Sequence, residues 1–324
     1  MSQFLSRCDA AAMDDAAAVL IAGGLVAFPT ETVYGLGADA CNAASVARIY
    51  SVKGRPADHP LIVHVASMDG LGDWASDVPA YAIALARDYW PGPMTLVVRR
   101  SDLAGDFVTG GQDTVGVRVP NHPVALGLLE AFAAAGGKGV AAPSANRFGN
   151  VSPTTAHAVA AELGDYLADG DQILDGGPCV VGVESTIIDC TGDLPKILRP
   201  GAITAQMIEE STGLQVVGSV EEPLIRVSGS LDSHYAPVAT VVLDQSPLAG
   251  QGFIAMAGVV AADGVVRLAA PKSHEEFAHD LYAALRAADE QGLATVVVQQ
   301  PAGDGIAIAI RDRLKRAAHG STQS

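Results

Sequence analysis

The stretch from residue 28 to residue 37 constrains this chain most, because it joins an apolar run to small polar residues. It reads Phe-Pro-Thr-Glu-Thr-Val-Tyr-Gly-Leu-Gly and continues the apolar run 25–28. A strand that stops at a proline and opens into hydroxyls presents hydrogen-bonding groups beside a sheet. A turn without chemistry is an equally good interpretation of this segment alone, because glycine and proline mark turns in most proteins.

Length and composition predict a globular chain with two domains. The chain has 324 residues, and a domain typically takes about 150. Hydrophobic residues make up 49% and charged residues 17%, which is typical of a packed core. No apolar run reaches the roughly 18 residues of a membrane span, and the N-terminus lacks the pattern of an export signal. We therefore expect a cytoplasmic protein without membrane contact.

Helix and strand patterns are mixed along the first two thirds of the chain, which predicts an open α/β sheet over residues 8–211. The expected helices cover 9–22, 43–50, 78–89, 123–135, 155–163 and 204–210. The expected strands cover 25–28, 61–65, 94–100, 114–119, 139–142, 172–174, 184–189 and 196–198.

The sequence changes character over residues 212–237, where glycine, serine and proline indicate a linker. A compact β/α pattern follows over 238–320, with expected strands at 239–243, 252–255, 265–268 and 294–299 and helices at 273–290 and 305–317. It has neither a Gly-x-Gly-x-x-Gly motif nor a Walker lysine. We expect a small Rossmann-like domain that acts as a lid or a docking module.

The charge balance directs attention to the few basic residues. The chain has 20 Lys and Arg against 36 Asp and Glu, a net charge of −16. Such a surface repels nucleic acid at long range, so stable RNA binding is not expected. Any basic cluster is then local and aimed at a small anion. The cysteines, at positions 8, 41, 179 and 190, have neither zinc nor disulfide spacing and are expected to be reduced.

One such cluster is Lys53-Gly-Arg55, in a segment stiffened by Pro56 and Pro60. Two cations that face one way repel each other, so an anion such as a triphosphate would explain the pair. A solvated basic turn is the commoner explanation of two cations at this spacing.

His64 and Arg118 lie inside apolar strands. Alternation places His64 on the face opposite Val63 and Val65, where it is either a core residue or a pocket residue. Arg118 shares a strand face with Thr114, and there it needs a carboxylate partner. That partner is either an acidic residue of the protein or a ligand.

Hydroxyls, amides and cations recur where the predicted strands begin or end. Ser144 and Asn146 follow a buried strand, Ser185 begins one, and Arg199 ends another. The pattern predicts one anion-binding crevice at the carboxyl edge of a sheet. Neither a Ser/His/Asp nucleophile nor a metal-ligand spacing is present. The chemistry indicated is positioning with charge neutralisation, as in phosphoryl or nucleotidyl transfer.

Taken in order, these motifs resemble those of the threonylcarbamoyl-AMP synthases, or L-threonylcarbamoyladenylate synthases. The matching segments are residues 28–37, Lys53-x-Arg55, 61–64, Ser144-x-Asn146, Ser152-Pro-Thr, Ser185-Thr-Ile-Ile-Asp and Arg199-Pro-Gly. The resemblance covers residues 10–237 and, more loosely, the tail to residue 320. It implies a YrdC-like domain, which is a twisted mixed sheet with a concave positive pocket, followed by the smaller C-terminal domain.

The resemblance implies a nucleotidyltransferase that converts L-threonine, bicarbonate or CO₂ and ATP to threonylcarbamoyl-AMP and pyrophosphate. The threonine amine would form a carbamate, whose oxygen attacks the α-phosphorus. Because such species decompose in water, a lid that excludes solvent makes chemical sense, and the linker ending at 234–237 is the candidate. The product would serve a downstream tRNA-modifying transferase complex that modifies the adenosine beside the anticodon.

The resemblance also implies roles for individual residues. The L-threonine site would comprise Thr32, His64, Arg118, Ala142 and Ser185. In that site Arg118 would bind the substrate carboxylate. The ATP site would comprise Arg55, His59, Thr114, Ser144, Asn146, Ser152, Arg199 and Tyr235. Lys53 and Arg55 would be the catalytic residues. Mg²⁺ would bind mainly through the ATP phosphates, because no carboxylate cage is visible in the sequence.

Within the opening stretch, Thr32 is the residue expected to touch threonine. Pro29, Gly35 and Gly37 are expected to shape the loop, while Glu31 and Tyr34 receive no role.

The chain departs from the family pattern in two places. Residues 228–233 read Ser-Gly-Ser-Leu-Asp-Ser where many relatives have a basic linker, so the positive charge that the linker adds to the triphosphate site is missing from this segment. His59 stands where asparagine is common, and protonation of its imidazole would make this contact depend on pH.

Two other functions are alternatives. One is an RNA-binding or ribosome-associated module that uses the same basic pocket without catalysis, against which the net charge argues. The other is carbamoyl transfer in hydrogenase maturation, whose proteins add zinc-finger-like and acylphosphatase-like segments that this chain lacks.

Overall fold

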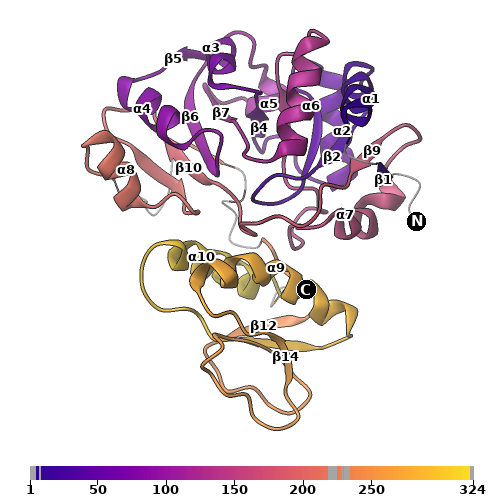
Figure 1. Cartoon of the computed structure of the whole chain (residues 1–324), viewed down its shortest axis with the longest axis vertical. Coiled ribbons are helices and arrows are strands. Elements are labelled where there is room, and N and C mark those ends of the chain that lie inside the picture. The colour runs from indigo at the N-terminus through magenta and orange to yellow at the C-terminus, as the bar shows by residue number, and fades with distance from the viewer. Residues whose placement is uncertain (1–4, 7–8, 218–224, 228, 230–233, 322–324) are drawn as a thin grey trace.

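A computed structural model describes residues 5–6, 9–217, 225–227, 229 and 234–321 (Figure 1). Within these residues, one sheet of 11 strands is followed by a separate sheet of 4 strands. Figure 1 shows the two sheets in separate lobes, with helices α9 and α10 of the second lobe facing the first. None of the described helices is long and apolar enough to cross a membrane.

The first lobe is the expected mixed sheet with helices packed on it. Its helices are α1 (Ala10–Ile21), α2 (Ala43–Lys53), α3 (Leu71–Trp74), α4 (Ala80–Tyr89), α5 (Asp106–Thr109), α6 (Pro123–Ala134), α7 (Ala156–Leu163) and α8 (Ala205–Thr212). Its strands are β1 (Leu5–Ser6), β2 (Val26–Phe28), β3 (Gly35–Asp39), β4 (Ile62–His64), β5 (Ala75–Asp77), β6 (Met94–Arg100), β7 (Thr114–Arg118), β8 (Val140–Ala141), β9 (Gln172–Leu174), β10 (Thr186–Asp189) and β11 (Lys196–Arg199). They are ordered β1-β9-β2-β3-β8-β4-β7-β6-β10-β11, and β5 pairs with β6.

The second lobe is a parallel sheet covered by two long helices. It contains β12 (Thr240–Leu243), β13 (Gly252–Ile254), β14 (Val266–Ala269), α9 (His274–Glu290), β15 (Thr295–Val298) and α10 (Ile306–Ser321). The strand order is β12-β15-β13-β14, and each neighbouring pair is parallel. Parallel strands need crossover connections, which usually contain helices, so this topology confirms the expected Rossmann-like pattern.

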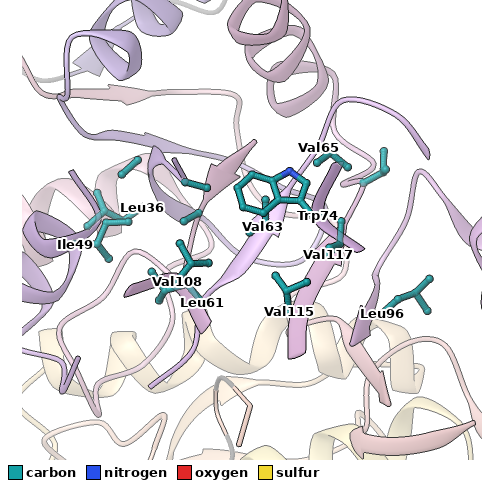
Figure 2. Packing of buried hydrophobic residues seen from close by; sticks show 14 of the residues in the cluster. Leu36, Ile49, Leu61, Val63, Val65, Trp74, Leu96, Val108, Val115 and Val117 are labelled. Atoms are coloured by element: carbon teal, nitrogen blue, oxygen red, sulfur yellow. The ribbon is translucent and has the colours of Figure 1, made fainter. Parts of the chain in front are cut away.

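Alternation along the central strands separates a core face from a polar face. Val63 on β4 and Val117 on β7 pair in register and are buried in the main core with Trp74 (Figure 2). Their neighbours His64 and Arg118 also pair in register and therefore lie on the opposite face. The sequence thus builds a hydrophobic core on one side of the sheet and places imidazole and guanidinium groups on the other.

The strand directions correct the prediction of a crevice at one carboxyl edge. β4 and β7 are parallel, whereas β8 runs antiparallel to β4 with Val140 opposite His64. The carboxyl end of β8 therefore lies at the edge opposite the carboxyl ends of β4 and β7. Strand ends meet at one edge only where the strands are parallel. The predicted polar residues gather over a face of this mixed sheet instead.

The glycines of the opening stretch also differ from the prediction. Gly35 and Gly37 lie in β3, which pairs antiparallel with β2, and do not form a loop. A Cβ atom on Gly37 would lie 2.7 Å from Val140 Cγ1 and 2.8 Å from Phe28 Cε1. Gly37 is thus required by close packing between strands, which is a known use of glycine in a sheet.

We expect Gly37→Ala to lower the free energy of unfolding by about 1–3 kcal/mol, because the added methyl group overpacks the contact with Val140 and Phe28. Urea unfolding followed by circular dichroism measures this change. Gly72→Ala is the control, since a Cβ atom at this α3 position meets nothing within 4 Å. Equal stability of Gly37→Ala and the wild type would contradict this packing argument.

Candidate functional site

Two adjoining cavities lie over the polar face of the first sheet. The main cavity is lined by Thr30, Thr32, Val33, Gly35, Ile62, His64, Arg118, Ala142, Pro143, Ser144, Glu184, Ser185, Arg199, Gly229, His234 and Tyr235. The side cavity is lined by Pro60, Leu61, Ile62, Thr95, Val97, Gln112, Thr114, Gly116, Ile187, Arg226 and Val227. Ile62 lines both cavities, so they are neighbours on the sheet face.

The structure brings most of the predicted site residues together. Those that line the main cavity are Thr32, His64, Arg118, Ala142, Ser144, Ser185, Arg199 and Tyr235. Thr114 lines the side cavity. The predicted residues that line neither cavity are Lys53, Arg55, His59, Asn146 and Ser152.

Arg118 is held by a chain of hydroxyl groups and by a carboxylate. Its Nη1 donates to Thr32 Oγ1 at 3.0 Å, and its Nη2 lies 2.8 Å from Glu31 Oε1. The hydroxyls of Thr30 and Thr32 are hydrogen-bonded to each other. Because Thr30 Oγ1 donates its only proton to the Val33 carbonyl, Thr32 must be the donor in this bond. The partner of Arg118 in this structure is therefore a protein acid, and Glu31, which had no predicted role, supplies it.

His64 is a neutral side chain aimed at the cavity. Its ring is buried, and burial together with the positive charge of Arg118 lowers its pKa from 6.5 to about 3. Its Nδ1 is buried and has no hydrogen-bond partner among the described residues. An unpaired buried nitrogen is costly unless a ligand or water pairs with it, so the pocket interpretation of His64 is favoured over the core interpretation.

Ser185 and Arg199 form a second anchored pair. Arg199 donates from Nε and Nη2 to the Ser185 carbonyl at 3.1 and 3.0 Å, and from Nη2 to Ser185 Oγ at 3.1 Å. Ser185 Oγ also lies 2.8 Å from Thr95 Oγ1. Since Thr95 lines the side cavity, this hydrogen bond joins the walls of the two cavities.

Lys53 and Arg55 are buried, and both donate hydrogen bonds to main-chain carbonyls. Lys53 Nζ donates to the carbonyls of Ser144 and Asn146 at 2.6 and 2.5 Å. Arg55 Nη2 donates to the Pro60 carbonyl at 3.0 Å. Burial lowers the pKa of both side chains, in the case of Arg55 to about 10. In this structure Lys53 shapes the loop that carries Ser144 rather than lining the cavity.

Glu184 is an acidic residue in a wall made mostly of neutral and basic groups. Its carboxylate accepts hydrogen bonds from Ser152 Oγ at 2.7 Å, Tyr282 Oη at 2.9 Å and Arg313 Nε at 2.7 Å. The charges of Arg313 and Arg199 and these hydrogen bonds outweigh burial and lower its pKa to about 2. Ser152 gives its only hydroxyl proton to Glu184, so toward any further partner it acts as an acceptor.

The end of the predicted linker covers the main cavity. Tyr235 is buried with a backbone φ of 63°, which is unusual for a residue other than glycine. Its hydroxyl has no hydrogen-bond partner among the described residues. Gly229 has a φ of 79°, and a Cβ atom there would lie 2.2 Å from that hydroxyl, so this position requires glycine. The other residues of the stretch 228–233, on which the linker prediction rested, lie outside the described residues.

An aromatic row connects these covering residues with the rest of the site. His59 contacts Phe148, Phe148 contacts His234, and His234 contacts Tyr235, with ring centres 5.5, 6.1 and 4.1 Å apart. His59 thus lies at the outer end of the row, and burial with the charge of Arg55 lowers its pKa.

Sequence reasoning missed several residues of the site. Arg226 of the linker lines the side cavity and donates to Asp58 at 3.2 Å and to the Gly110 carbonyl at 2.9 Å, so the linker does bring a basic side chain to the site. Glu184 begins the predicted strand 184–189, and Arg313 lies in the predicted helix 305–317, so neither position indicates a site residue. The signal in the sequence is that Arg313 shares a helix face with Ala309, Ile310 and Ala317, because a cation on an apolar face needs a partner.

We expect the free energy of unfolding to fall by about 2–3 kcal/mol between pH 7.5 and pH 5.5. Burial lowers the pKa of His64 and His234 to about 3, whereas in the unfolded chain both take up protons near 6.5. The unfolded state therefore binds more protons below pH 6.5, and stability is lost as the pH falls. Urea unfolding at several pH values measures the slope.

His64→Gln should remove about half of this slope. A pH-independent free energy of unfolding over the same interval would show that the two imidazoles are not held neutral by the fold.

Comparison with known proteins agrees with the architecture of both lobes. A family model of Sua5, YciO and YrdC proteins, described as telomere recombination, matches residues 18–201. A model described as the C-terminal domain of threonylcarbamoyl-AMP synthase matches residues 203–319.

Relatives of full length match as well. Threonylcarbamoyl-AMP synthase from Bacillus subtilis is 40% identical over 328 residues, which covers 94% of this chain and 92% of that protein. The Pyrococcus abyssi enzyme is 39% identical, with coverage of 93% and 92%. The crystal structure of P. abyssi Sua5 complexed with L-threonine has a TM-score of 0.87 at 37% identity, covering 98% of both chains. The chain belongs to the threonylcarbamoyl-AMP synthase family.

Proposed function

We propose that this protein is an L-threonylcarbamoyladenylate synthase and thus a nucleotidyltransferase. The observation that supports this most directly is the main cavity, which is lined by Arg118 and Arg199 and by two residues with unpaired buried polar atoms, His64 Nδ1 and the Tyr235 hydroxyl. Anchored cations and unpaired buried polar groups together suit a small anionic substrate. A P. abyssi relative is described as complexed with L-threonine, which supports threonine as one such substrate.

The threonine carboxylate is assigned to Arg118. Thr32 and Glu31 fix its guanidinium in the cavity wall, and a fixed planar fork suits bidentate binding of a carboxylate. Ser185, His64 and Ala142 line the same cavity and complete the proposed threonine site.

ATP is assigned to the Arg199 side and to the side cavity. Arg199 and Ser144 line the main cavity, and the side cavity adds Thr114, Arg226 and apolar side chains such as Val97. An apolar slot with a few polar groups suits a nucleoside, while the cations suit its phosphates. Lys53 and Asn146 would act indirectly, through the loop that carries Ser144.

The proposed reaction needs no covalent bond to the protein. The threonine amine nitrogen bonds to the carbon of CO₂ and loses a proton, and a carbamate oxygen then displaces pyrophosphate from the α-phosphorus. His64, with a pKa of about 3, and Glu184, with a pKa of about 2, are both weak bases. The residues of this site therefore contribute by positioning the reactants, neutralising charge and excluding water.

Mg²⁺ is proposed to arrive bound to ATP. Within the described part of the chain, no group of three or more His, Cys, Asp or Glu residues could hold a metal ion, and Glu184 is already committed to Ser152, Tyr282 and Arg313. When bound, the ion would neutralise phosphate charge, and the cavity cations would do the same from the protein side.

The product's role in threonylcarbamoyl modification of tRNA, through a downstream transferase complex in the cytoplasm, is proposed from the family. We also propose that residues 8–211 form the catalytic domain, 212–237 the linker and 238–320 a supporting domain.

Pyrophosphate release tests the proposed activity. Protein mixed with Mg-ATP, bicarbonate and L-threonine should release pyrophosphate, and release should stop when threonine or bicarbonate is omitted. Release that is absent, or that does not depend on threonine, would refute the proposal.

A salt titration of tRNA binding tests the alternative of an RNA-binding module, which predicts tight, salt-sensitive binding.

We expect Arg118→Lys to weaken L-threonine binding roughly 10- to 100-fold while changing ATP affinity by less than about threefold, because lysine lacks the guanidinium fork. Isothermal titration with each ligand measures the two effects. Arg199→Lys is the matched variant and should show the reverse preference. Equal losses for both ligands in Arg118→Lys would contradict the assignment.

A further inference from the structure

Glu184 poses a physical problem for the proposed site. Among the described residues that line the main cavity it is the one carboxylate, and its side chain is 7% exposed. Its pKa, lowered to about 2, keeps it ionised at neutral pH. A buried negative charge beside an anion site repels phosphate unless a cation balances it.

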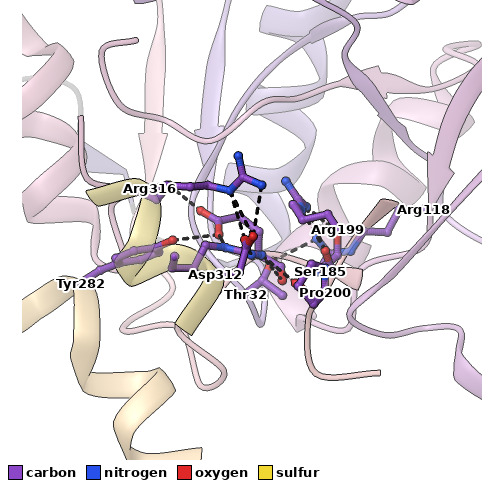
Figure 3. Close-up of polar contacts among 11 residues, drawn as sticks. Thr32, Arg118, Ser185, Arg199, Pro200, Tyr282, Asp312 and Arg316 are labelled. Carbon is purple, nitrogen blue, oxygen red and sulfur yellow. Dashed lines mark hydrogen bonds and ion pairs between the residues drawn. The ribbon is translucent and has the colours of Figure 1, made fainter. Parts of the chain in front are cut away.

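The balancing cation comes from the other lobe. Arg313 of α10 is fully buried, and its Nε donates to Glu184 Oε2 at 2.7 Å. Tyr282 of α9 donates to the same oxygen at 2.9 Å. Figure 3 shows Tyr282 and Asp312 of the second lobe in one cluster of polar contacts that also includes Ser185 and Pro200 of the first.

Arg313 also contacts the main chain that carries the nucleotide-side residues. Its Nη2 donates to the Pro200 carbonyl at 3.0 Å, directly after Arg199. Glu184, its ion-pair partner, directly precedes Ser185, and Arg199 in turn bonds to the Ser185 carbonyl. The Arg313 guanidinium lies 5.4 Å from the centre of the Tyr235 ring. The Arg313 side chain thus contacts Glu184, which precedes Ser185, and Pro200, which follows Arg199, and it also lies near the Tyr235 ring.

We propose that Arg313 is a positioning residue for the ATP side of the site: from the C-terminal lobe it neutralises Glu184 and, through the Pro200 carbonyl, fixes the segment that carries Arg199. The inference rests on the proposed function, because it assigns ATP to the Arg199 side. It gives the C-terminal lobe a specific task in substrate binding. Arg313 does not line the cavity, so it acts through Glu184 and Pro200 rather than on the substrate.

The consequence of losing Arg313 follows from charge. Glu184 would keep its hydrogen bonds from Ser152 and Tyr282 but lose its ion-pair partner. The uncompensated carboxylate would then repel the triphosphate and attract Arg199 away from its place beside Ser185. L-Threonine binding should change much less, because Arg118 is anchored separately by Thr32 and Glu31, and Ser185 Oγ keeps its contact with Thr95 Oγ1.

Arg313→Gln tests the inference in the full chain. We expect the affinity for a non-hydrolysable ATP analogue with Mg²⁺ to fall roughly 10- to 100-fold, with less than about a threefold change for L-threonine, both measured by isothermal titration. Arg311→Gln is the matched control: it removes the same charge from α10, but Arg311 bonds to the carbonyls of Pro301 and Gly303. Its ATP affinity should match that of the wild type.

A second substitution separates positioning from a general structural role. Glu184→Gln combined with Arg313→Gln removes both charges, and its first change keeps the shape of the side chain, so ATP affinity should recover to within about fivefold of the wild type. A double variant that binds ATP as weakly as Arg313→Gln would overturn the inference, as would unchanged ATP affinity in Arg313→Gln.

If Arg313→Gln does not fold, Tyr282→Phe gives a milder test. It removes one hydrogen bond from Glu184 and should weaken ATP binding roughly three- to tenfold without affecting threonine binding. Equal effects on both ligands, or none on ATP, would overturn the inference. A wild-type protein that fails to bind the ATP analogue would instead refute the proposed function, so the two failures are distinguishable.

Discussion

The structure depends on holding buried cations in place in and around the main cavity. Lys53, Arg55, Arg118, Arg199 and Arg313 are each 6% exposed or less, and a buried cation without a partner is strongly unfavourable. Each therefore has fixed acceptors: main-chain carbonyls for Lys53, Arg55 and Arg199, and a carboxylate for Arg118 and Arg313. Because main-chain carbonyls bring no net negative charge, they orient Arg199 in the cavity wall without neutralising it.

The mixed sheet is what allows these groups to share one face. Antiparallel β8 brings residues 142–144 to the side of β4 where Ile62 lies, while parallel β4 and β7 place His64 opposite Arg118. Ligand sites of parallel sheets lie outside the carboxyl ends of the strands. Here the polar face of short strands, covered by the linker, forms the cavity, and the opposite face carries the core around Val63 and Trp74.

Local sequence patterns were enough to predict most elements and the faces of their residues. β6 has the predicted bounds, and alternation placed His64 opposite Val63. The sequence did not predict β3, because glycine has a low propensity for strands. The need for glycine at position 37 becomes clear only from its close packing against Val140. The crevice was misplaced because strand direction depends on non-local pairing. The pair formed by Arg313 and Glu184 spans 129 residues, so no local pattern could reveal it.

The acidic surface and the basic cavity select ligands by size. The net charge of −16 lies mainly on exposed side chains, and at physiological salt its field decays over about 8 Å. A large polyanion that contacts the surface meets this repulsion along its whole length. A small anion inside the cavity is farther from the surface carboxylates and is repelled less by them. It lies close to the anchored guanidinium groups of Arg118 and Arg199 in a less polar environment, where the attraction between opposite charges is stronger. Burial of the cations, together with their anchoring, therefore favours a small anion over a long polyanion.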